Sequence, residues 1–292
     1  MKRIVILGCE NSHANTFLGF MAQDKKYSDV EVVGVYSHDP AAMKNLAEKY
    51  GVKAMASYDE TVGQVDGVIV TARHGDNHRK YAEPYLCKDL AVFIDKPFTV
   101  SEEDAVSFLK KAKEVGAKIC GGSSCRFDAL VQQLRADRIA EEGGKTLGGF
   151  VRCPVSMNNP NGEFFFYAQH LVEIVGEIFG RYPKSVRSRR YEKCVGATFL
   201  YDGFEVGGIY ADESYNCYYA LRNAVNADQG GVFTVGADNP CFRKEFDEFY
   251  ELLSGGEQVS AWNDLAAPVF VLNALDRAMK SGKEESVGEV KL

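Results

Sequence analysis

The chain has 292 residues, of which 46% are hydrophobic, and a formal net charge of −7. This length is typical of two domains rather than one, and no run of 18 apolar residues is present that would span a membrane. The acidic balance, with Lys and Arg scattered along the chain, argues against nucleic acid or an anionic membrane as a partner.

The beginning of the chain and its cysteines indicate the compartment. The apolar run at residues 4–7 is too short for the core of a secretory signal and reaches Gly8 at once, so we expect a first strand in a cytoplasmic protein. Eight cysteines are scattered without CxxC spacing, and a chain of this size needs no disulfides. We therefore expect reduced thiols buried in the core.

In the first 122 residues, short apolar runs alternate with segments of helical period, as is typical of strands buried on both faces of a parallel sheet. Pro40 and Ser101 mark helix starts, and Gly51 and Gly116 mark helix ends. The expected strands are 3–7, 30–36, 66–71, 90–94 and 117–120, and the expected helices are 13–23, 40–50, 77–88 and 102–115. The alternation predicts an α/β domain over residues 1–122 with a Rossmann-type, doubly wound parallel sheet.

After Gly122 the pattern changes, and residues 123–292 are predicted to form a second, α+β domain with a mostly antiparallel open sheet. Asp202-Gly203 indicates a hairpin turn. The expected helices are 127–142, 163–179, 241–253 and 264–280, and the expected strands are 149–157, 197–201, 204–210, 215–221 and 288–292, with further strand-like stretches between 184 and 236.

Ligands of open α/β sheets bind beyond the carboxyl ends of the strands, so four loops are the places to look for a site. They span residues 8–13, 37–39, 72–78 and 95–97. They follow the strands expected at 3–7, 30–36, 66–71 and 90–94, which we number as the first, second, fourth and fifth strands of the sheet. Four of the five histidines in the chain fall in these loops: His13, His38, His74 and His78. Their position on one predicted edge favours a functional site over scattered surface placement.

The first loop departs from the G-x-G-x-x-G fingerprint of dinucleotide-binding folds. Gly8 stands at its first glycine, but Glu10 replaces the second and His13 the third. The second glycine normally lets the backbone approach a pyrophosphate, although the helix that begins near Asn11 and Ser12 still offers unpaired N–H groups to a phosphate. Two other interpretations of Glu10 stay open: a cap of that helix, or a metal ligand together with His13.

The end of the second strand has Ser37 and His38 where an acid would hold the ribose of NAD. A serine beside a cationic histidine suits a 2′-phosphate, so we expect NADP at least as readily as NAD. Asp39, before Pro40, is expected to cap the next helix. The remaining residues expected to bind a cofactor are Thr71, Arg73, His74, His78, Asp95 and Lys96.

Lys96 and His170 are the candidate catalytic side chains. Lys96 directly follows a buried strand, where a long cation emerges at the sheet edge, and Pro97 biases it toward extended backbone. His170 lies on an aromatic-rich helix near Tyr167. An ordinary surface lysine and a core histidine are the alternatives.

Taken together, these segments resemble the Gfo/Idh/MocA family, which includes glucose–fructose oxidoreductase and inositol dehydrogenases, over nearly the whole chain. The residues that carry the resemblance are Ile94-Asp95-Lys96-Pro97-Phe98, with Asp in place of the Glu of a Glu-Lys-Pro motif, Asn77-His78, Cys125-Arg126-Phe127, and His170 with Gly180. In many members an Asp stands four residues before the histidine; here Phe166 stands there, with Tyr167 beside it as another source of a hydroxyl.

The resemblance implies a nicotinamide-dependent oxidoreductase acting on a sugar, polyol or related hydroxy compound, and a homodimer or homotetramer. Lys96 would bind the substrate oxygen and stabilise developing charge, and His170 would be the general acid and base. Arg126 and Tyr167 would complete the substrate site, and no metal is expected.

Two alternatives remain open from the sequence. In the first, Glu10, His13, His74 and His78 line a metal or anionic-ligand site, and the protein is a non-redox enzyme or a ligand sensor. In the second, the chain is a scaffold without chemistry that partners a related enzyme.

Overall fold

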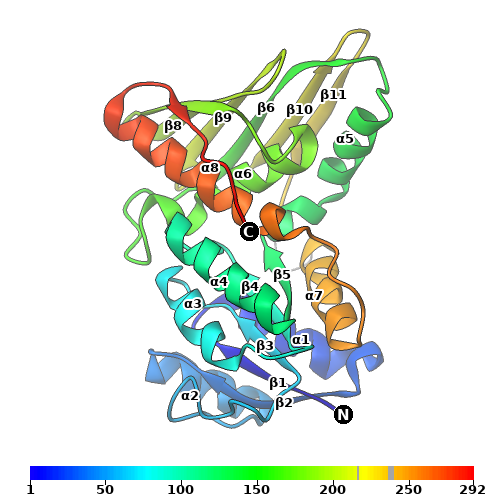
Figure 1. Ribbon diagram of the computed structural model, residues 1–292, viewed down its shortest axis with the longest axis vertical. Coiled ribbons are helices and arrows are strands. Elements are labelled where there is room, and N and C mark those ends of the chain that lie inside the picture. Colours follow the sequence, from blue (N-terminus) through cyan, green and yellow to red (C-terminus); the bar gives the residue numbers. More distant parts are fainter. Residues whose placement is uncertain (216, 236–239) are drawn as a thin grey trace.

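The computed structural model describes residues 1–215, 217–235 and 240–292. The strands of these ranges form two sheets, one at each end of the long axis of the molecule, with helices between them (Figure 1). No helix in the described part of the chain is both long and apolar enough to cross a membrane.

The first sheet is parallel throughout and has the order β2-β1-β3-β4-β5. Its strands are β1 (Lys2–Leu7), β2 (Val30–Tyr36), β3 (Gly67–Val70), β4 (Ala91–Asp95) and β5 (Lys118–Gly122). The helices between them are α1 (Ser12–Gln23), α2 (Pro40–Tyr50), α3 (Asp76–Ala82) and α4 (Glu102–Val115), with short 3-10 turns η1 (Lys25–Tyr27) and η2 (Glu83–Tyr85). The predicted Rossmann-type sheet is confirmed.

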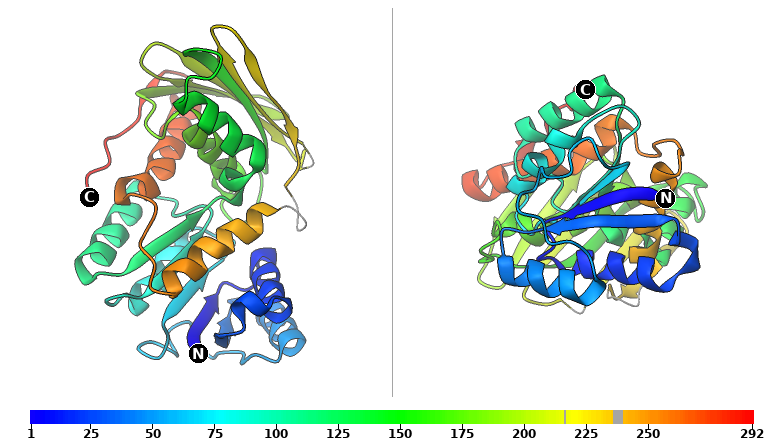
Figure 2. Two further views of the ribbon diagram at one scale, coloured as in Figure 1. Left: turned by 90° about the vertical axis from the view of Figure 1, so that its right-hand side faces the viewer. Right: turned by 90° about the horizontal axis from the view of Figure 1, so that it is seen from below.

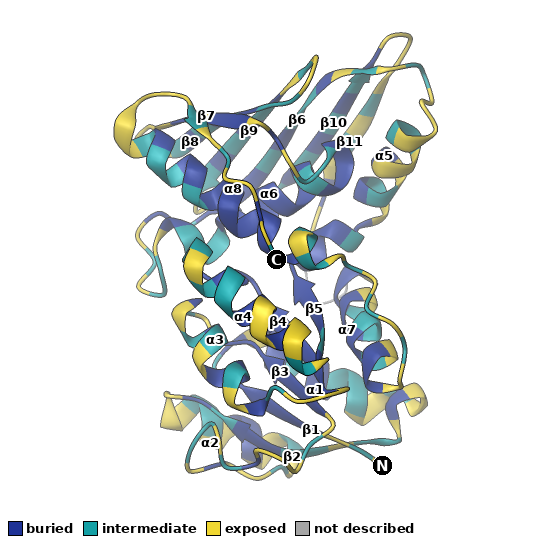
Figure 3. Ribbon diagram, in the orientation of Figure 1, coloured by how far each residue is buried: buried dark blue, intermediate teal, exposed yellow. Residues whose placement is uncertain are grey.

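Burial explains why the strands read as continuous apolar runs. In β1, Ile4 and Ile6 belong to the core that packs under α1 and α2, whereas Val5 and Leu7 belong to the core under α3 and α4. All four are fully buried, because helices cover both faces of the sheet (Figure 3).

The helix ends follow the predicted local chemistry. The Asp39 carboxylate accepts hydrogen bonds from two amides of the first turn of α2, and the Ser101 hydroxyl accepts one from the first turn of α4. Gly51 and Gly116 take left-handed conformations at the C-caps, with φ of 67° and 77°. The helix expected at 77–88 is shorter, because the 3-10 turn η2, with Pro84 inside it, replaces its second half.

The strand numbering expected from the sequence is wrong by one. Between β2 and β3 the described chain makes only an isolated bridge, Val35 to Ala54. Asp95 therefore ends the fourth strand of the sheet and not the fifth, and the loop at 72–78 follows the third. The predicted loops nevertheless meet at one edge, because all of these strands are parallel.

The second sheet has the order β11-β10-β6-β9-β8-β7-β12 and is antiparallel except for the pair β6–β9. Its strands are β6 (Thr146–Val155), β7 (Ser185–Arg190), β8 (Cys194–Leu200), β9 (Glu205–Asp212), β10 (Tyr218–Ala224), β11 (Asp228–Phe233) and β12 (Glu285–Ser286). The mostly antiparallel sheet and the Asp202-Gly203 hairpin are confirmed. Position 216 of the expected strand 215–221, and position 236, lie outside the described residues.

Helices cover the face of the second sheet that is turned toward the first, and none of the described helices lies on its opposite face (Figure 2). They are α5 (Ala129–Ile139), α6 (Phe164–Phe179) and α8 (Trp262–Ser281), and the 3-10 turn η3 (Ser124–Phe127) leads into α5. The helix α7 (Pro240–Leu253) crosses back to the first sheet, where Phe246 and Phe249 join the core under α1. Leu265 and Phe270 of α8 likewise join the core of α4.

Two further expectations are wrong, one for this half and one for the cysteines of the whole chain. No strand forms at 288–292; the chain pairs with β7 only at β12 and then leaves the sheet, so that Val290 is buried against the first domain. The cysteines are not uniformly core residues: Cys87 is exposed and Cys194 and Cys217 are half-buried, while the other five are buried.

Gly8 allows two loops to approach closely at the carboxyl edge of the first sheet, where the candidate site lies. Its φ is 79°, and a Cβ atom built on it would lie 2.2 Å from the backbone nitrogen of Ala72. The Thr71 hydroxyl donates to the Gly8 carbonyl at 3.1 Å. The loops after β1 and β3 therefore touch backbone to backbone, which only glycine allows.

We expect Gly8→Ala to lower the free energy of unfolding by about 2–5 kcal/mol, the sum of left-handed strain and overpacking. Gly51→Ala is the matched control, because Gly51 has a similar φ but no atom within 4 Å of the added Cβ; it should cost only about 1–2 kcal/mol. Denaturant unfolding of both variants measures the difference. Equal losses would contradict the close approach of the two loops.

Candidate active site

Asp95 is the charged centre of the edge formed by the first sheet. It ends β4, its side chain is fully buried, and its Oδ1 accepts a hydrogen bond from the Lys96 amide at 2.7 Å. Asn11 Nδ2 donates to its Oδ2 at 3.2 Å, and His13 Nδ1 lies 2.8 Å from the same oxygen in an ion-pair contact. Burial raises the pKa of Asp95, but His13 and Lys96 outweigh it, so the pKa lies below its usual value.

Lys96 points from this edge into the second domain. Its side chain is buried, and its ammonium donates to the Phe166 carbonyl at 3.3 Å. The same ammonium lies 4.5 Å from the ring centre of Phe166 and 4.4 Å from that of Tyr167. Burial lowers the pKa of Lys96, although Asp95 opposes this.

His170, on α6, lies on the same tyrosine ring as Lys96, that of Tyr167. Its Nδ1 is 2.7 Å from the Ser123 hydroxyl and 3.4 Å from the Cys125 thiol, and its ring packs on Tyr167 with centroids 5.1 Å apart. Burial lowers the pKa of His170 well below its usual value, and the charge of Lys96 lowers it further. The imidazole is therefore neutral near neutral pH and its Nδ1 edge is held, so Nε2 is the nitrogen left for chemistry.

A second link fixes the Lys96 segment to α6. The Phe98 amide donates to Gln169 Oε1 at 2.8 Å, and Gln169 Nε2 donates to Glu173 at 2.9 Å. His78 supports the same segment from the other side, with its Nε2 2.7 Å from the Ala72 carbonyl and its Nδ1 3.4 Å from that of Phe98. The expected cofactor ligand His78 is thus a fully buried clamp between two loops.

Glu10 joins three loops at the carboxyl edge and caps no helix. Its Oε2 accepts a hydrogen bond from the Ser37 hydroxyl at 2.7 Å, and its Oε1 accepts one from the Arg73 amide at 3.0 Å. The cap of α1 is instead Asn11, whose Oδ1 accepts from the His13 amide. The interpretation of Glu10 as a helix cap is therefore wrong.

The loop histidines do not come together. The His38 side chain is 53% exposed and lies 3.9 Å from Glu10, whereas His74 accepts a bond from the Asp76 amide. With His13 at Asp95 and His78 on backbone carbonyls, no group of three or more His, Cys, Asp or Glu side chains in the described ranges is arranged to hold a metal. The histidine cluster inferred from the sequence is not formed.

Arg126 is engaged away from the Lys96 ammonium. Its guanidinium forms a buried ion pair with Glu248 of α7 and stacks on Phe127, 4.1 Å from the ring centre. In this arrangement Arg126 joins η3 to α7, while the predicted partners Lys96, Tyr167 and His170 gather without it.

Three residues of the site were not found from the sequence. Ser123 follows the last strand of the first sheet, so the same rule about strand ends points to it. Gln169 neighbours His170 on α6. Glu245 lies three residues after Phe242 and four before Phe249, on the apolar face of α7, where an acid is out of place.

Glu245 is fully buried, and neither of its oxygens has a hydrogen-bond partner among the described residues. Burial raises the pKa of Glu245 well above its usual value; the charges of Asp95 and Glu248 raise it further, and Arg126 opposes them. Burial and the negative charge of Asp95 therefore both favour the protonated, neutral form of Glu245 in the folded protein.

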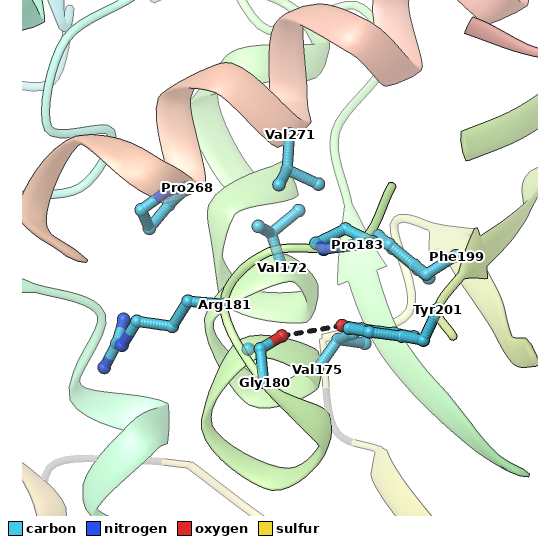
Figure 4. Close-up of a pocket in the computed structure, with 10 residues that line it drawn as sticks. Val172, Val175, Gly180, Arg181, Pro183, Phe199, Tyr201, Pro268 and Val271 are labelled. Carbon is cyan, nitrogen blue, oxygen red and sulfur yellow. Dashed lines mark hydrogen bonds between the residues drawn. The ribbon is translucent and has the colours of Figure 1, made fainter. Parts of the chain in front are cut away.

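The pocket shown in Figure 4 is a separate feature. It lies between α6, α8 and the second sheet and is lined mainly by apolar side chains: Val172, Val175, Pro183, Phe199, Pro268 and Val271. Its drawn hydrogen bond joins the Tyr201 hydroxyl to the Gly180 carbonyl. None of the candidate catalytic residues lines it, so we assign it no part in the chemistry.

Residues 2–122 match the family model described as an oxidoreductase family with an NAD-binding Rossmann fold. Glucose-6-phosphate 3-dehydrogenase of Bacillus subtilis strain 168 is 26% identical over 150 residues, which are 50% of this chain and 41% of that protein. The 2,7-anhydro-N-acetylneuraminate hydratase of Escherichia coli K12 is 25% identical over 177 residues, 55% of this chain and 46% of that one. The matches thus span less than half the length of these curated relatives.

The solved structures show the fold over the full length. Scyllo-inositol dehydrogenase of Lactobacillus casei, with bound NAD(H) and scyllo-inositol, superimposes with a TM-score of 0.82 at 14% identity and covers 98% of this chain and 99% of its own. Both halves of the molecule therefore share the architecture of that enzyme.

The buried acid gives a pH dependence with a definite sign. The folded state keeps a proton on Glu245 that the unfolded state releases above its usual pKa near 4.5, so the contribution to stability is full below that pH and is lost as the pH rises. The wild type should therefore lose stability relative to Glu245→Gln above about pH 5, with a limiting slope of about 1.4 kcal/mol per pH unit.

Denaturant unfolding of both proteins between pH 4 and 8 tests this. The exposed Glu251→Gln on the same helix is the control and should follow the wild type. If Glu245→Gln follows the wild type as well, Glu245 does not hold a proton in the folded state.

Proposed function

Because residues 2–122 match the model of an NAD-binding oxidoreductase family, we propose that the protein belongs to the Gfo/Idh/MocA family and is a nicotinamide-dependent oxidoreductase of a sugar, polyol or related hydroxy compound. The observation that carries the proposal is the meeting of Lys96, Tyr167 and His170. Lys96 comes from the dinucleotide-binding domain and the other two from α6, and the Tyr167 ring contacts both.

The residues at the sheet edge fit a dinucleotide. The twelve-residue helix α1 begins there and is capped by Asn11, and Glu10 turns its carboxylate to the strand ends rather than to the helix N-terminus. The first turn of α1 can thus receive a pyrophosphate, and the Glu10 carboxylate can accept hydrogen bonds from ribose hydroxyls. A bound dinucleotide supplies the hydride acceptor, its nicotinamide ring.

A dinucleotide held at this edge would supply the acceptor for the hydride of the carbinol carbon. His170 would take the hydroxyl proton of the same secondary alcohol, so that the alcohol would become a carbonyl compound and the imidazole would become protonated. The lowered pKa of His170 keeps the imidazole neutral and able to accept, and the nearby Lys96 charge favours later release of the proton.

Lys96 acts on the substrate oxygen. Its ammonium has a single hydrogen bond, to the Phe166 carbonyl, among the described residues, and otherwise faces aromatic rings. It therefore keeps donors for an alkoxide-like oxygen in a low-dielectric setting, where a fixed charge is most effective. Tyr167 orders both groups through its ring contacts and offers its hydroxyl to the substrate.

A non-redox reaction on the same scaffold is a second candidate. Phe166 gives His170 no carboxylate at the place where many members have an Asp, and a relative at 25% identity is named a hydratase. The separation of the loop histidines does not support the metal-sensor alternative.

We further propose that the protein is cytoplasmic and forms a homodimer or homotetramer with a carbohydrate-like small molecule as its ligand. The face of the second sheet that no described helix covers supports the assembly (Figure 2). Light scattering on purified protein tests it, and a mass of about one chain would contradict it.

Calorimetric titration with NAD(H) and NADP(H) tests the proposed function directly. We expect at least one dinucleotide to bind folded protein with a Kd in the micromolar range typical of such cofactors (~1–100 μM). Absence of binding by all four forms, in protein with intact circular dichroism, would exclude the redox reaction.

Catalytic variants test the assigned residues. With the most active compound of a polyol and sugar panel, Lys96→Ala and His170→Asn should each lower kcat/KM by about 10²–10⁴, the range for lost charge stabilisation or acid–base catalysis. Dinucleotide binding should persist in His170→Asn. The exposed Lys88→Ala controls for loss of charge, and wild-type activity of either catalytic variant would contradict its role.

A further inference from the structure

We propose that Glu10 makes the protein select NAD over NADP by supplying, from the loop after β1, the carboxylate that the end of β2 lacks. This inference rests on the proposed function, because it concerns the same dinucleotide. It also replaces the preference for NADP that Ser37 and His38 suggest in the sequence.

The residue directly after β2 is not an acid. Ser37 and His38 follow the strand, and the first acid, Asp39, caps α2, where its Oδ1 accepts hydrogen bonds from the Ala41 and Ala42 amides, both at 3.0 Å. A dinucleotide fold ordinarily has a carboxylate at this point, where it accepts a hydrogen bond from the ribose 2′-hydroxyl.

Glu10 brings a carboxylate to this point. Its Oε2 accepts from the Ser37 hydroxyl at 2.7 Å, and Ser37 in turn accepts from the Asp39 amide at 3.0 Å. Its Oε1 accepts from the Arg73 amide at 3.0 Å, at the end of the neighbouring segment after β3. Since the sheet order is β2-β1-β3, these bonds hold the carboxylate across three adjacent strand ends.

The carboxylate is fixed rather than mobile. The Glu10 side chain is only 7% exposed, and two hydrogen bonds to different loops hold its orientation. Each carboxylate oxygen can accept a second hydrogen bond, so a ribose hydroxyl can be added without breaking those present.

A 2′-phosphate at the same place meets a like charge. His38 cannot compensate, because its ring is half-exposed and its Nδ1 lies 3.9 Å from the Glu10 carboxylate, which offsets any positive charge it carries. The juxtaposition of like charges at a fixed site disfavours the phosphorylated dinucleotide, while the hydroxyl of NAD gains a charge-assisted hydrogen bond.

Glu10 leaves the pyrophosphate position open. The carboxylate bonds to the ends of β2 and β3, and the α1 cap is supplied by Asn11. The loss of the second fingerprint glycine is therefore compatible with dinucleotide binding, and it brings a change in how the ribose is recognised.

Binding of NADH and NADPH, followed by fluorescence and calorimetry, tests the inference. The wild type should bind NADH at least about 100-fold more tightly than NADPH. Glu10→Gln keeps the shape and an acceptor oxygen but removes the charge, and it should narrow this ratio at least tenfold by weakening NADH and tightening NADPH. The control Glu48→Gln, on α2 with a side chain 67% exposed, should leave the ratio unchanged.

A second variant separates charge placement from simple obstruction. Glu10→Gln combined with Ser37→Asp returns an acid to the end of β2 and should restore the preference for NADH. If Glu10→Gln and Glu10→Ala tighten both dinucleotides equally, Glu10 is only an obstacle and the inference is wrong.

The failures are distinguishable. Wild-type protein that binds NADPH as tightly as NADH would overturn the role of Glu10 and leave the proposed oxidoreductase intact. Wild-type protein that binds neither would overturn both. Circular dichroism and thermal unfolding of each variant verify that the protein is folded, so that loss of binding reports on the site.

Discussion

The buried carboxylate of Asp95 is the constraint on which the candidate site depends. An ionised carboxylate with no solvent contact is tolerated only where charges and donors compensate the lost hydration. Here Asn11 and His13 come from the start of α1, and the third partner is the backbone amide of Lys96. The need to satisfy one charge thus draws together the loop after β1 and the loop after β4, which are 84 residues apart in sequence.

The same segment then reaches the second domain. Phe98 donates to Gln169, and the Lys96 ammonium contacts the Phe166 carbonyl and the rings of Phe166 and Tyr167. Because α7 also packs on β4 and β5 with Phe246 and Phe249, the two sheets are joined through α7 as well as through the Lys96 segment. Rigid placement of this kind keeps an ammonium and an imidazole at a fixed separation from the carboxyl edge of the first sheet.

The glycine loop shows how a chain can depart from a fingerprint without losing its geometry. Gly8 is retained where two backbones touch, because any Cβ would overlap Ala72. The other two positions carry side chains that point away from the helix N-terminus: Glu10 toward the ends of β2 and β3, and His13 toward Asp95. The side chains that replace the two glycines thereby form contacts that connect the loops at the carboxyl edge of the first sheet.

Local features of the amino-acid sequence predict an α/β domain followed by an α+β domain, the parallel and antiparallel sheets, most helix ends and the edge at which the candidate residues gather. These follow from local rules: apolar period, the chemistry of Asp39, Ser101, Gly51 and Gly116, and the shared direction of parallel strands. The partner of each polar side chain, in contrast, becomes visible only in the folded chain. Glu10 bonds Ser37, His78 clamps two carbonyls, Arg126 pairs with Glu248, and the acid Glu245 is buried with no hydrogen-bond partner among the described residues. These roles depend on distances between residues remote in sequence and on burial that changes their charge, and no local pattern contains either quantity.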